Sequence, residues 1–206
     1  EYLTAIMYLA PAKENTKGVN LCPKASQGCL QACLYTAGRG KFSNVQAARI
    51  NKADWFVDDR PAFLEQLHKE ILRHSMNARL LGKKPAVRLN GTSDIQWERY
   101  LDMKLYPEVQ FYDYTKWEPR DRRKVITIPN YHLTFSRAED TPDQYVKDTV
   151  GHHQQNVAVV FSDQALPATY LGFPVFNGDL TDLRFLDPNE HIIGLVAKGE
   201  AKKDDS

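Results

Sequence analysis

All three cysteines of this chain lie in one stretch, Leu21-Cys22-Pro23-Lys24-Ala25-Ser26-Gln27-Gly28-Cys29-Leu30-Gln31-Ala32-Cys33. Their spacing is C-x6-C-x3-C. An odd number of cysteines cannot form a closed set of disulfides, and neighbouring thiolates are the usual ligands of iron–sulfur clusters. Gly28 permits the tight backbone that would bring successive thiolates inward. Cys29 and Cys33 are one helical turn apart, so a helix would direct both toward the same centre.

We therefore expect Cys22, Cys29 and Cys33 to hold a 4Fe–4S cluster. Three thiolates leave one iron of such a cluster without a cysteine, and that iron would take a small-molecule ligand. Zinc is the alternative, but a Cys3His site needs a histidine and the nearest along the chain is His68. Folding could bring a histidine to the loop, so zinc stays open. The remaining interpretation is three buried thiols without a ligand.

The rest of the chain predicts alternating strands and helices. Strands are expected at 3–9, 85–89, 109–112, 131–135, 157–161, 174–176 and 192–196. We expect Ser43 to cap one helix, Asp59 to cap a longer one that ends at Gly82, and Thr141 to cap a short one up to Val150. A further helix is expected over 95–105. A basic helical turn is expected between the third and fourth strands.

Strands separated by helix-length connections indicate an α/β fold with a mostly parallel sheet. Seven strands fit a partial or closed barrel, similar to a TIM barrel, with the cysteine-rich loop after the first strand. A doubly wound open sheet is the alternative. We expect one domain over residues 1–198, followed by a charged, frayed tail at 199–206.

Composition limits the classes of partner. The net charge of +1 gives no overall attraction to nucleic acid or to an anionic membrane. No apolar run is long enough to cross a bilayer, and residues 1–10 do not look like a signal peptide. We expect a cytoplasmic protein with reduced thiols and no membrane partner. Basic residues cluster locally at Arg120, Arg122, Arg123 and Lys124, where a solvated face is favoured over a binding patch.

Two polar segments follow predicted strands, where α/β proteins place their ligand sites. The first consists of Asn90, Gly91, Thr92, Ser93 and Asp94. It would hold the polar end of a small molecule, or form an ordinary turn in which Ser93 or Asp94 caps the next helix. The second, Ser136 and Arg137, would bind a carboxylate or phosphate; an ion pair of Arg137 with Glu139 or Asp140 is the simpler interpretation.

Other polar residues carry weaker signals. Arg39 would either donate to a ligand of the cluster or hold the loop in place. The oxygen-rich set Asn177, Asp179, Asp182 and Asp187 matches no cation loop, so turns and caps are favoured over magnesium or calcium. His152 and His153 lack a partner at metal-binding spacing, so an exposed position after a helix is favoured.

Several segments occur in one order over nearly the whole chain. They are 8–13, 20–23, Gly28-Cys29, Ala32-Cys33, 36–40, 87–94, 177–179 and 182–188. Together they resemble the gene product 88 family of phage and prophage proteins. The resemblance implies a phage protein that works in the cytoplasm of a bacterial host. It implies no particular activity.

The order of elements is also similar, more loosely, to radical S-adenosylmethionine enzymes. These have a three-cysteine loop after the first strand of a partial barrel, and the segment after the second strand grips the cofactor. That resemblance implies S-adenosylmethionine near Asn90 to Asp94. Its usual spacing is C-x3-C-x2-C, and this chain departs from it, which puts cofactor cleavage in doubt.

We thus expect a phage-encoded cluster protein, either a diverged radical S-adenosylmethionine enzyme or a redox protein with an electron donor. The alternative is a non-enzymatic, zinc- or cluster-stabilised phage protein that binds a host protein or nucleic acid. A pocket beside the cluster, lined by Asn90, Ser93, Asp94 and Arg137, would favour the enzyme. A fourth protein ligand would favour the structural role.

Overall fold

The computed structural model describes residues 1–33, 35, 38–162, 165–198 and 201–202. These residues form two compact units. The first unit comprises 1–23, 42–113 and 119–132. The second comprises 24–41, 114–118 and 133–206, within the described ranges.

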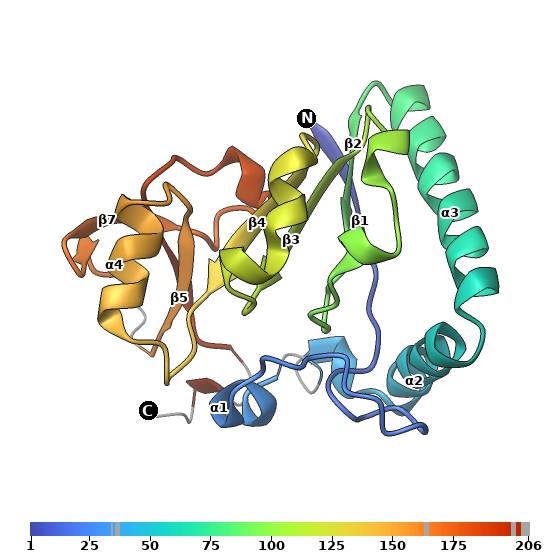
Figure 1. The fold of residues 1–206 in the computed structure, drawn as a ribbon, viewed down its shortest axis with the longest axis horizontal. Coiled ribbons are helices and arrows are strands. Elements are labelled where there is room, and N and C mark those ends of the chain that lie inside the picture. The colour runs from blue at the N-terminus through green and yellow to red at the C-terminus, as the bar shows by residue number, and fades with distance from the viewer. Residues whose placement is uncertain (34, 36–37, 163–164, 199–200, 203–206) are drawn as a thin grey trace. The chain divides into compact units, whose positions relative to one another are not determined.

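The first unit contains a parallel strand pair and two long helices (Figure 1). β1 (Tyr2–Ile6) pairs with β2 (Lys84–Arg88). α2 (Ser43–Asp58) precedes α3 (Arg60–Leu80), which contacts β2. α3 starts at the predicted cap, because the Asp59 carboxylate accepts the Ala62 N–H at 3.1 Å. Past its end Gly82 takes a φ of +64°, which favours glycine.

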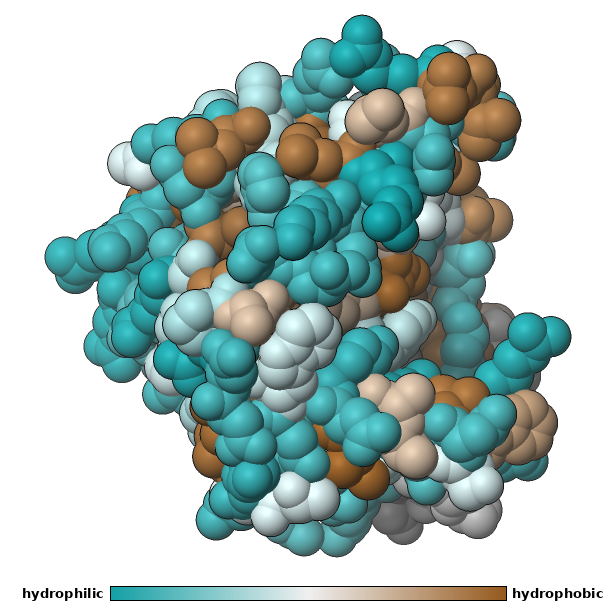
Figure 2. Space-filling view, turned by 90° about the vertical axis from the view of Figure 1, so that its right-hand side faces the viewer, coloured by the Kyte–Doolittle hydropathy of each residue, from teal (hydrophilic) through white to brown (hydrophobic). Residues whose placement is uncertain are grey.

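One face of α3 supplies the core and another carries apolar side chains in water. Phe63, Leu67, Ile71 and Ala78 are buried at helical spacing. Leu72, Met76 and Leu80 are 43%, 63% and 83% exposed. Their spacing of four residues places them along one side of the helix. Figure 2 views this side of the molecule and shows hydrophobic residues gathered toward the C-terminal end of α3.

The first unit continues through short 3-10 turns rather than the predicted helix. η3 (Trp97–Arg99) and η4 (Met103–Leu105) replace the helix expected over 95–105, so that prediction is wrong. The reason is that side chains form hydrogen bonds with the backbone groups that a helix would pair with one another. Asn90 bonds both the N–H and the carbonyl of Ile95, and the Asn130 amide donates to the Met103 carbonyl at 2.9 Å. The predicted basic turn is confirmed as η5 (Pro119–Thr127).

The second unit holds most of the remaining sheet. Its elements are α1 (Gln27–Gln31), η2 (Gly38–Lys41), α4 (Asp143–Gly151), β5 (Val157–Phe161), β6 (Thr169–Tyr170), β7 (Phe173–Asn177), η6 (Arg184–Leu186) and β8 (Ile192–Val196). β3 (Gln110–Thr115) and β4 (Tyr131–Ser136) each contribute residues to both units. The core joins α4 to the strands through Val146, Val150, Val157 and Ile192.

The strand order is β1-β2-β3-β4-β5-β8-β7-β6. The pairs β1–β2, β2–β3, β4–β5, β5–β8 and β7–β8 are parallel, and β6 pairs with β7 in antiparallel fashion. The mixed α/β class with a mostly parallel sheet is therefore confirmed. Within the described ranges, β1 and β6 are not paired, so hydrogen bonds do not close the sheet. The barrel and the single domain stay predictions.

Three smaller expectations have different outcomes. Ser43 is the first residue of α2 and Phe42 its N-cap, so Ser43 is not the cap. Thr141 does not cap α4 either, because the N-cap is Pro142; the Thr141 hydroxyl instead accepts the Ala138 N–H at 3.0 Å. Most of the predicted tail, 199–200 and 203–206, lies outside the described residues.

In the part of the chain that the structure describes, no helix is long and apolar enough to cross a membrane.

Candidate functional site

Cys22 lies in the first unit, beside the loop that follows β2. Its half-buried sulfur accepts the Ala12 N–H at 3.3 Å and lies 3.6 Å from the Thr92 carbonyl oxygen, to which the thiol donates. Leu21, the preceding residue, bonds the same two segments: its N–H donates to Ala12 and its carbonyl accepts from Asp94, both at 2.9 Å. The sulfur is therefore held by backbone groups of two separate segments.

The loop from Asn90 to Asp94 is joined to the segment after β1. The Gly91 N–H donates to the Met7 carbonyl at 2.9 Å, and the Thr92 hydroxyl donates to the Leu9 carbonyl at 2.6 Å. A Cβ on Gly91 would lie 2.6 Å from the Met7 oxygen. Only glycine permits this approach of the two backbones.

Asn90 uses its side chain to shape the loop. Its Oδ1 accepts from the Ser93 hydroxyl, the Ile95 N–H and the Trp97 indole at 2.9 to 3.0 Å. Its Nδ2 donates to the Ile95 carbonyl at 2.9 Å. These contacts within the segment fit its interpretation as a turn. The capping role of Ser93 or Asp94 is wrong, because no α-helix begins at Ile95.

A chain of buried polar groups extends from this loop through the first unit. Asp113 is fully buried and accepts the Asn90 N–H at 2.7 Å and the Tyr131 hydroxyl at 2.9 Å. The Tyr131 oxygen accepts from Arg122 at 3.1 Å. Arg122 forms a two-pronged ion pair with Glu98, at 2.9 and 2.5 Å. The expected solvated face is thus wrong for Arg122, which is buried.

Burial raises the pKa values of two groups in this series of hydrogen-bonded residues, Asp113 and Tyr131. It raises the pKa of Asp113 to about 7, although hydrogen bonds from Asn90 and Tyr131 and the charge of Arg88 act to lower it. Burial, together with the Asp113 charge, raises the pKa of Tyr131 well above its usual value. Sequence reasoning missed Asp113. Its one signal was a carboxylate in the middle of an aromatic strand, Gln110-Phe111-Tyr112-Asp113-Tyr114.

In the second unit, α1 carries Cys29 and is held by Glu139. Ser26 caps α1 by accepting the Cys29 N–H at 3.2 Å and donates its hydroxyl to Glu139 at 2.5 Å. The Gly28 N–H also donates to Glu139, at 2.7 Å. A Cβ on Gly28 would lie 2.9 Å from the Glu139 carboxyl carbon. Partial burial acts to raise the pKa of Glu139, but these hydrogen bonds lower it overall.

Cys33, also in the second unit, accepts the Tyr35 N–H at 3.5 Å. Arg137 pairs with Asp143 at 2.7 Å and contacts the Tyr170 hydroxyl. The expected pairing with Glu139 or Asp140 is wrong, because the carboxylate that pairs with Arg137 is that of Asp143. Glu139 instead accepts hydrogen bonds from Ser26 and Gly28. The Ser136 carbonyl accepts from the Lys116 ammonium at 3.3 Å.

The acidic residues near β8 serve the fold. Arg184 and Asp187 form a buried ion pair at 3.3 Å, and Asp179 accepts from the Val196 N–H and the Lys198 ammonium. The Asn177 side chain accepts the Asp179 N–H at 3.0 Å. These contacts support turns and caps. Further residues of the predicted set are exposed: Arg39 in η2, and His152 and His153 after α4.

The three cysteines are half-buried and none is in a disulfide. Among the residues described, no group of three or more His, Cys, Asp or Glu side chains is arranged to hold a metal ion. The first unit brings Cys22 together with the Asn90 to Asp94 loop, and the second holds Cys29, Cys33, Ser136 and Arg137.

A family model described as Gene product 88 matches the chain over residues 1–206. Neither the curated proteins nor the solved structures include a match.

Proposed function

This chain belongs to the gene product 88 family, and we propose that it is a phage-encoded protein that binds a 4Fe–4S cluster through Cys22, Cys29 and Cys33. The observation that carries the proposal is a set of three half-buried thiols, free of disulfides, within one short segment. Thiolates in such numbers are the preferred ligands of iron–sulfur clusters.

Backbone hydrogen bonds to sulfur support this choice of ligands. The Ala12 N–H donates to the Cys22 sulfur and the Tyr35 N–H to that of Cys33. Hydrogen bonds of this type stabilise thiolate charge and tune the reduction potential of a bound cluster. When bound, the cluster would supply electron transfer or an open iron, and the protein would orient and shield it.

The ligand of the open iron is proposed to lie against the loop from Asn90 to Asp94. Cys22 contacts Thr92, so a molecule bound next to the Cys22 thiolate would meet this loop. S-adenosylmethionine is the candidate that the order of elements favours, and another small molecule with a polar end would suit the same position. An electron donor would complete a redox role.

Metal content tests the proposal. Protein purified without oxygen should be brown, absorb near about 400 nm, and contain about four irons and four sulfides per chain. Cys22→Ala, Cys29→Ala and Cys33→Ala should each lower these amounts, whereas Ala25→Ser in the same segment should not. Stoichiometric zinc without sulfide would overturn the cluster and favour the zinc-stabilised, non-enzymatic alternative.

The ligand at the open iron has a separate test. Adding S-adenosylmethionine to the reduced protein should alter the electron paramagnetic resonance spectrum of the cluster. Asp94→Ala should weaken that change more than it lowers iron content. A spectrum that does not respond to the cofactor would leave an electron-transfer or structural role for the cluster.

A further inference from the structure

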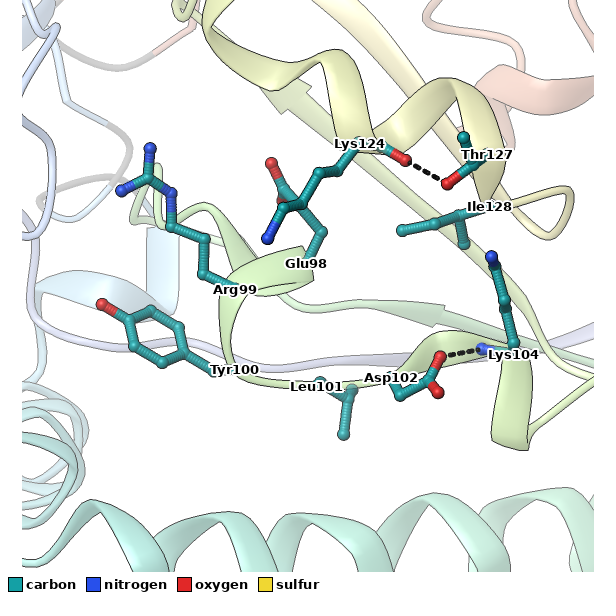
Figure 3. Close-up of a pocket in the computed structure, with 9 residues that line it drawn as sticks. All are labelled: Glu98, Arg99, Tyr100, Leu101, Asp102, Lys104, Lys124, Thr127 and Ile128. Carbon is teal, nitrogen blue, oxygen red and sulfur yellow. Dashed lines mark hydrogen bonds between the residues drawn. The ribbon is translucent and has the colours of Figure 1, made fainter.

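The first unit contains a pocket of about 340 Å³ between two segments of chain. Residues 98–102 and Lys104 form one wall, and Lys124, Thr127 and Ile128 form the other (Figure 3). Figure 3 shows the Lys104 side chain extending from η4 toward the η5 wall. The volume falls in the range of pockets that accept small organic ligands, about 300 to 1,000 Å³.

Three cationic side chains line this pocket without a protein counter-ion. Among the described residues, the side chains of Arg99, Lys104 and Lys124 have neither an ion pair nor a hydrogen bond. Their exposure in water makes this arrangement tolerable, but it leaves three positive charges unbalanced. Uncompensated cations around a concavity attract anions.

The acidic residues of the pocket do not cancel this charge. Glu98 is already neutralised by Arg122, and both side chains are only 2% exposed. Asp102 uses one carboxylate oxygen to accept the Lys104 backbone N–H at 3.1 Å. The pocket therefore presents three cations against one exposed carboxylate.

Buried contacts hold in place the two segments that carry the cations. The Glu98–Arg122 ion pair ties one wall to the other. Trp97, just before the first wall, and Met103, between Asp102 and Lys104, are fully buried. On the second wall the Thr127 hydroxyl donates to the Lys124 carbonyl at 2.9 Å. The backbone beneath the cations is thus preorganised, which lowers the cost of binding a ligand.

We propose that this pocket binds the phosphate group of a ligand, with Arg99, Lys104 and Lys124 as its charge partners. A phosphate offers several acceptor oxygens in different directions, which suits donors that come from two walls. The pocket has room for an organic part attached to the phosphate. The phosphate could belong to a free nucleotide or to the backbone of a single-stranded nucleic acid.

Calorimetric titration of the whole chain tests the site. Pyrophosphate, adenosine monophosphate and a short oligothymidylate are titrated separately at low salt. At least one should bind saturably, and Lys104→Gln and Lys124→Gln should each weaken it by about tenfold, the effect of losing one charge-assisted contact. Lys83→Gln removes the same charge from another part of the first unit and should leave binding unchanged.

The three probes distinguish the source of the phosphate. Binding of the two small molecules indicates a free phosphorylated ligand, and binding of the oligothymidylate alone indicates a nucleic-acid backbone. Absence of saturable binding by all three would overturn the site. Equal weakening by Lys83→Gln would also overturn it, because the attraction would then be general rather than local.

Discussion

Asp113 places a carboxyl group in the interior of the first unit, where burial raises its pKa from 3.8 to about 7. Between these values the folded protein keeps a proton that the unfolded chain has lost. The free energy of unfolding therefore falls, for this group, as pH rises from about 4 to about 7, and it changes no further above that. Asp113 thus favours the folded state more in mild acid than at alkaline pH.

Replacing Asp113 by Asn removes this dependence on pH. The Asn side chain keeps the size of Asp113 but cannot ionise. We expect the melting temperature of Asp113→Asn to change less than that of the wild type between about pH 5 and about pH 8. Thermal denaturation at several pH values measures the slope. Asp102→Asn, at an exposed carboxylate, is the control, and an unaltered slope in Asp113→Asn would show that Asp113 does not titrate in this range.

Gly28 and Glu139 depend on each other. Alanine in place of glycine normally stabilises a helix, by up to about 1 kcal/mol. At position 28 the new methyl group would displace the Glu139 carboxylate and its hydrogen bonds, a loss of about 1 kcal/mol that offsets the gain. We expect Gly28→Ala to stabilise the protein clearly only when Glu139→Ala is also present. Urea denaturation of the single and double variants measures this, and additive effects would contradict it.

At the scale of elements, most strands could be predicted because they contain apolar runs rich in β-branched residues, such as Val157-Ala158-Val159-Val160. β6 was missed because two residues make no pattern. The helix over 95–105 was misassigned because its apolar spacing is helical. In the structure, the side-chain amides of Asn90 and Asn130 form hydrogen bonds with backbone carbonyls of this segment that a helix would use itself.

The candidate site could be predicted only where it is local in sequence. The cysteine spacing and the polar loop after β2 are visible in short windows. The contacts of Glu139 with Gly28, and of Arg122 with Glu98, join residues far apart in the chain. A single sequence contains no local signal for such pairs.

The cap of α3 provides a test of an element predicted correctly. Asp59→Ala removes the side-chain acceptor for the Ala62 N–H and should lower the free energy of unfolding by about 1 kcal/mol. Asn77→Ala, on an exposed position of the same helix, should have a smaller effect. Chemical denaturation compares the two, and equal stabilities would mean that the Asp59 cap does not stabilise the helix.

At the scale of the whole molecule, a bound cluster would add its binding energy to the folding energy of the cysteine segment. Cys29→Ala should then lose iron and melt at a lower temperature than the wild type, and chelation of the wild type should have the same effect. Calorimetry with metal analysis on the same samples measures both. A metal-free variant that melts like the wild type would show that folding does not depend on the metal.

The apolar stripe of Leu72, Met76 and Leu80 on α3 has a consequence for colloidal behaviour. With an isoelectric point near 7.9, the molecules repel one another least just above neutral pH. Attraction between exposed stripes is then least opposed, so light scattering of concentrated solutions should be greatest near about pH 8 and fall toward about pH 6. Met76→Lys should suppress the scattering at pH 8, whereas Asn77→Lys, which adds the same charge beside the stripe, should suppress it less. Storage buffers on the acidic side of neutrality should therefore keep the protein dispersed.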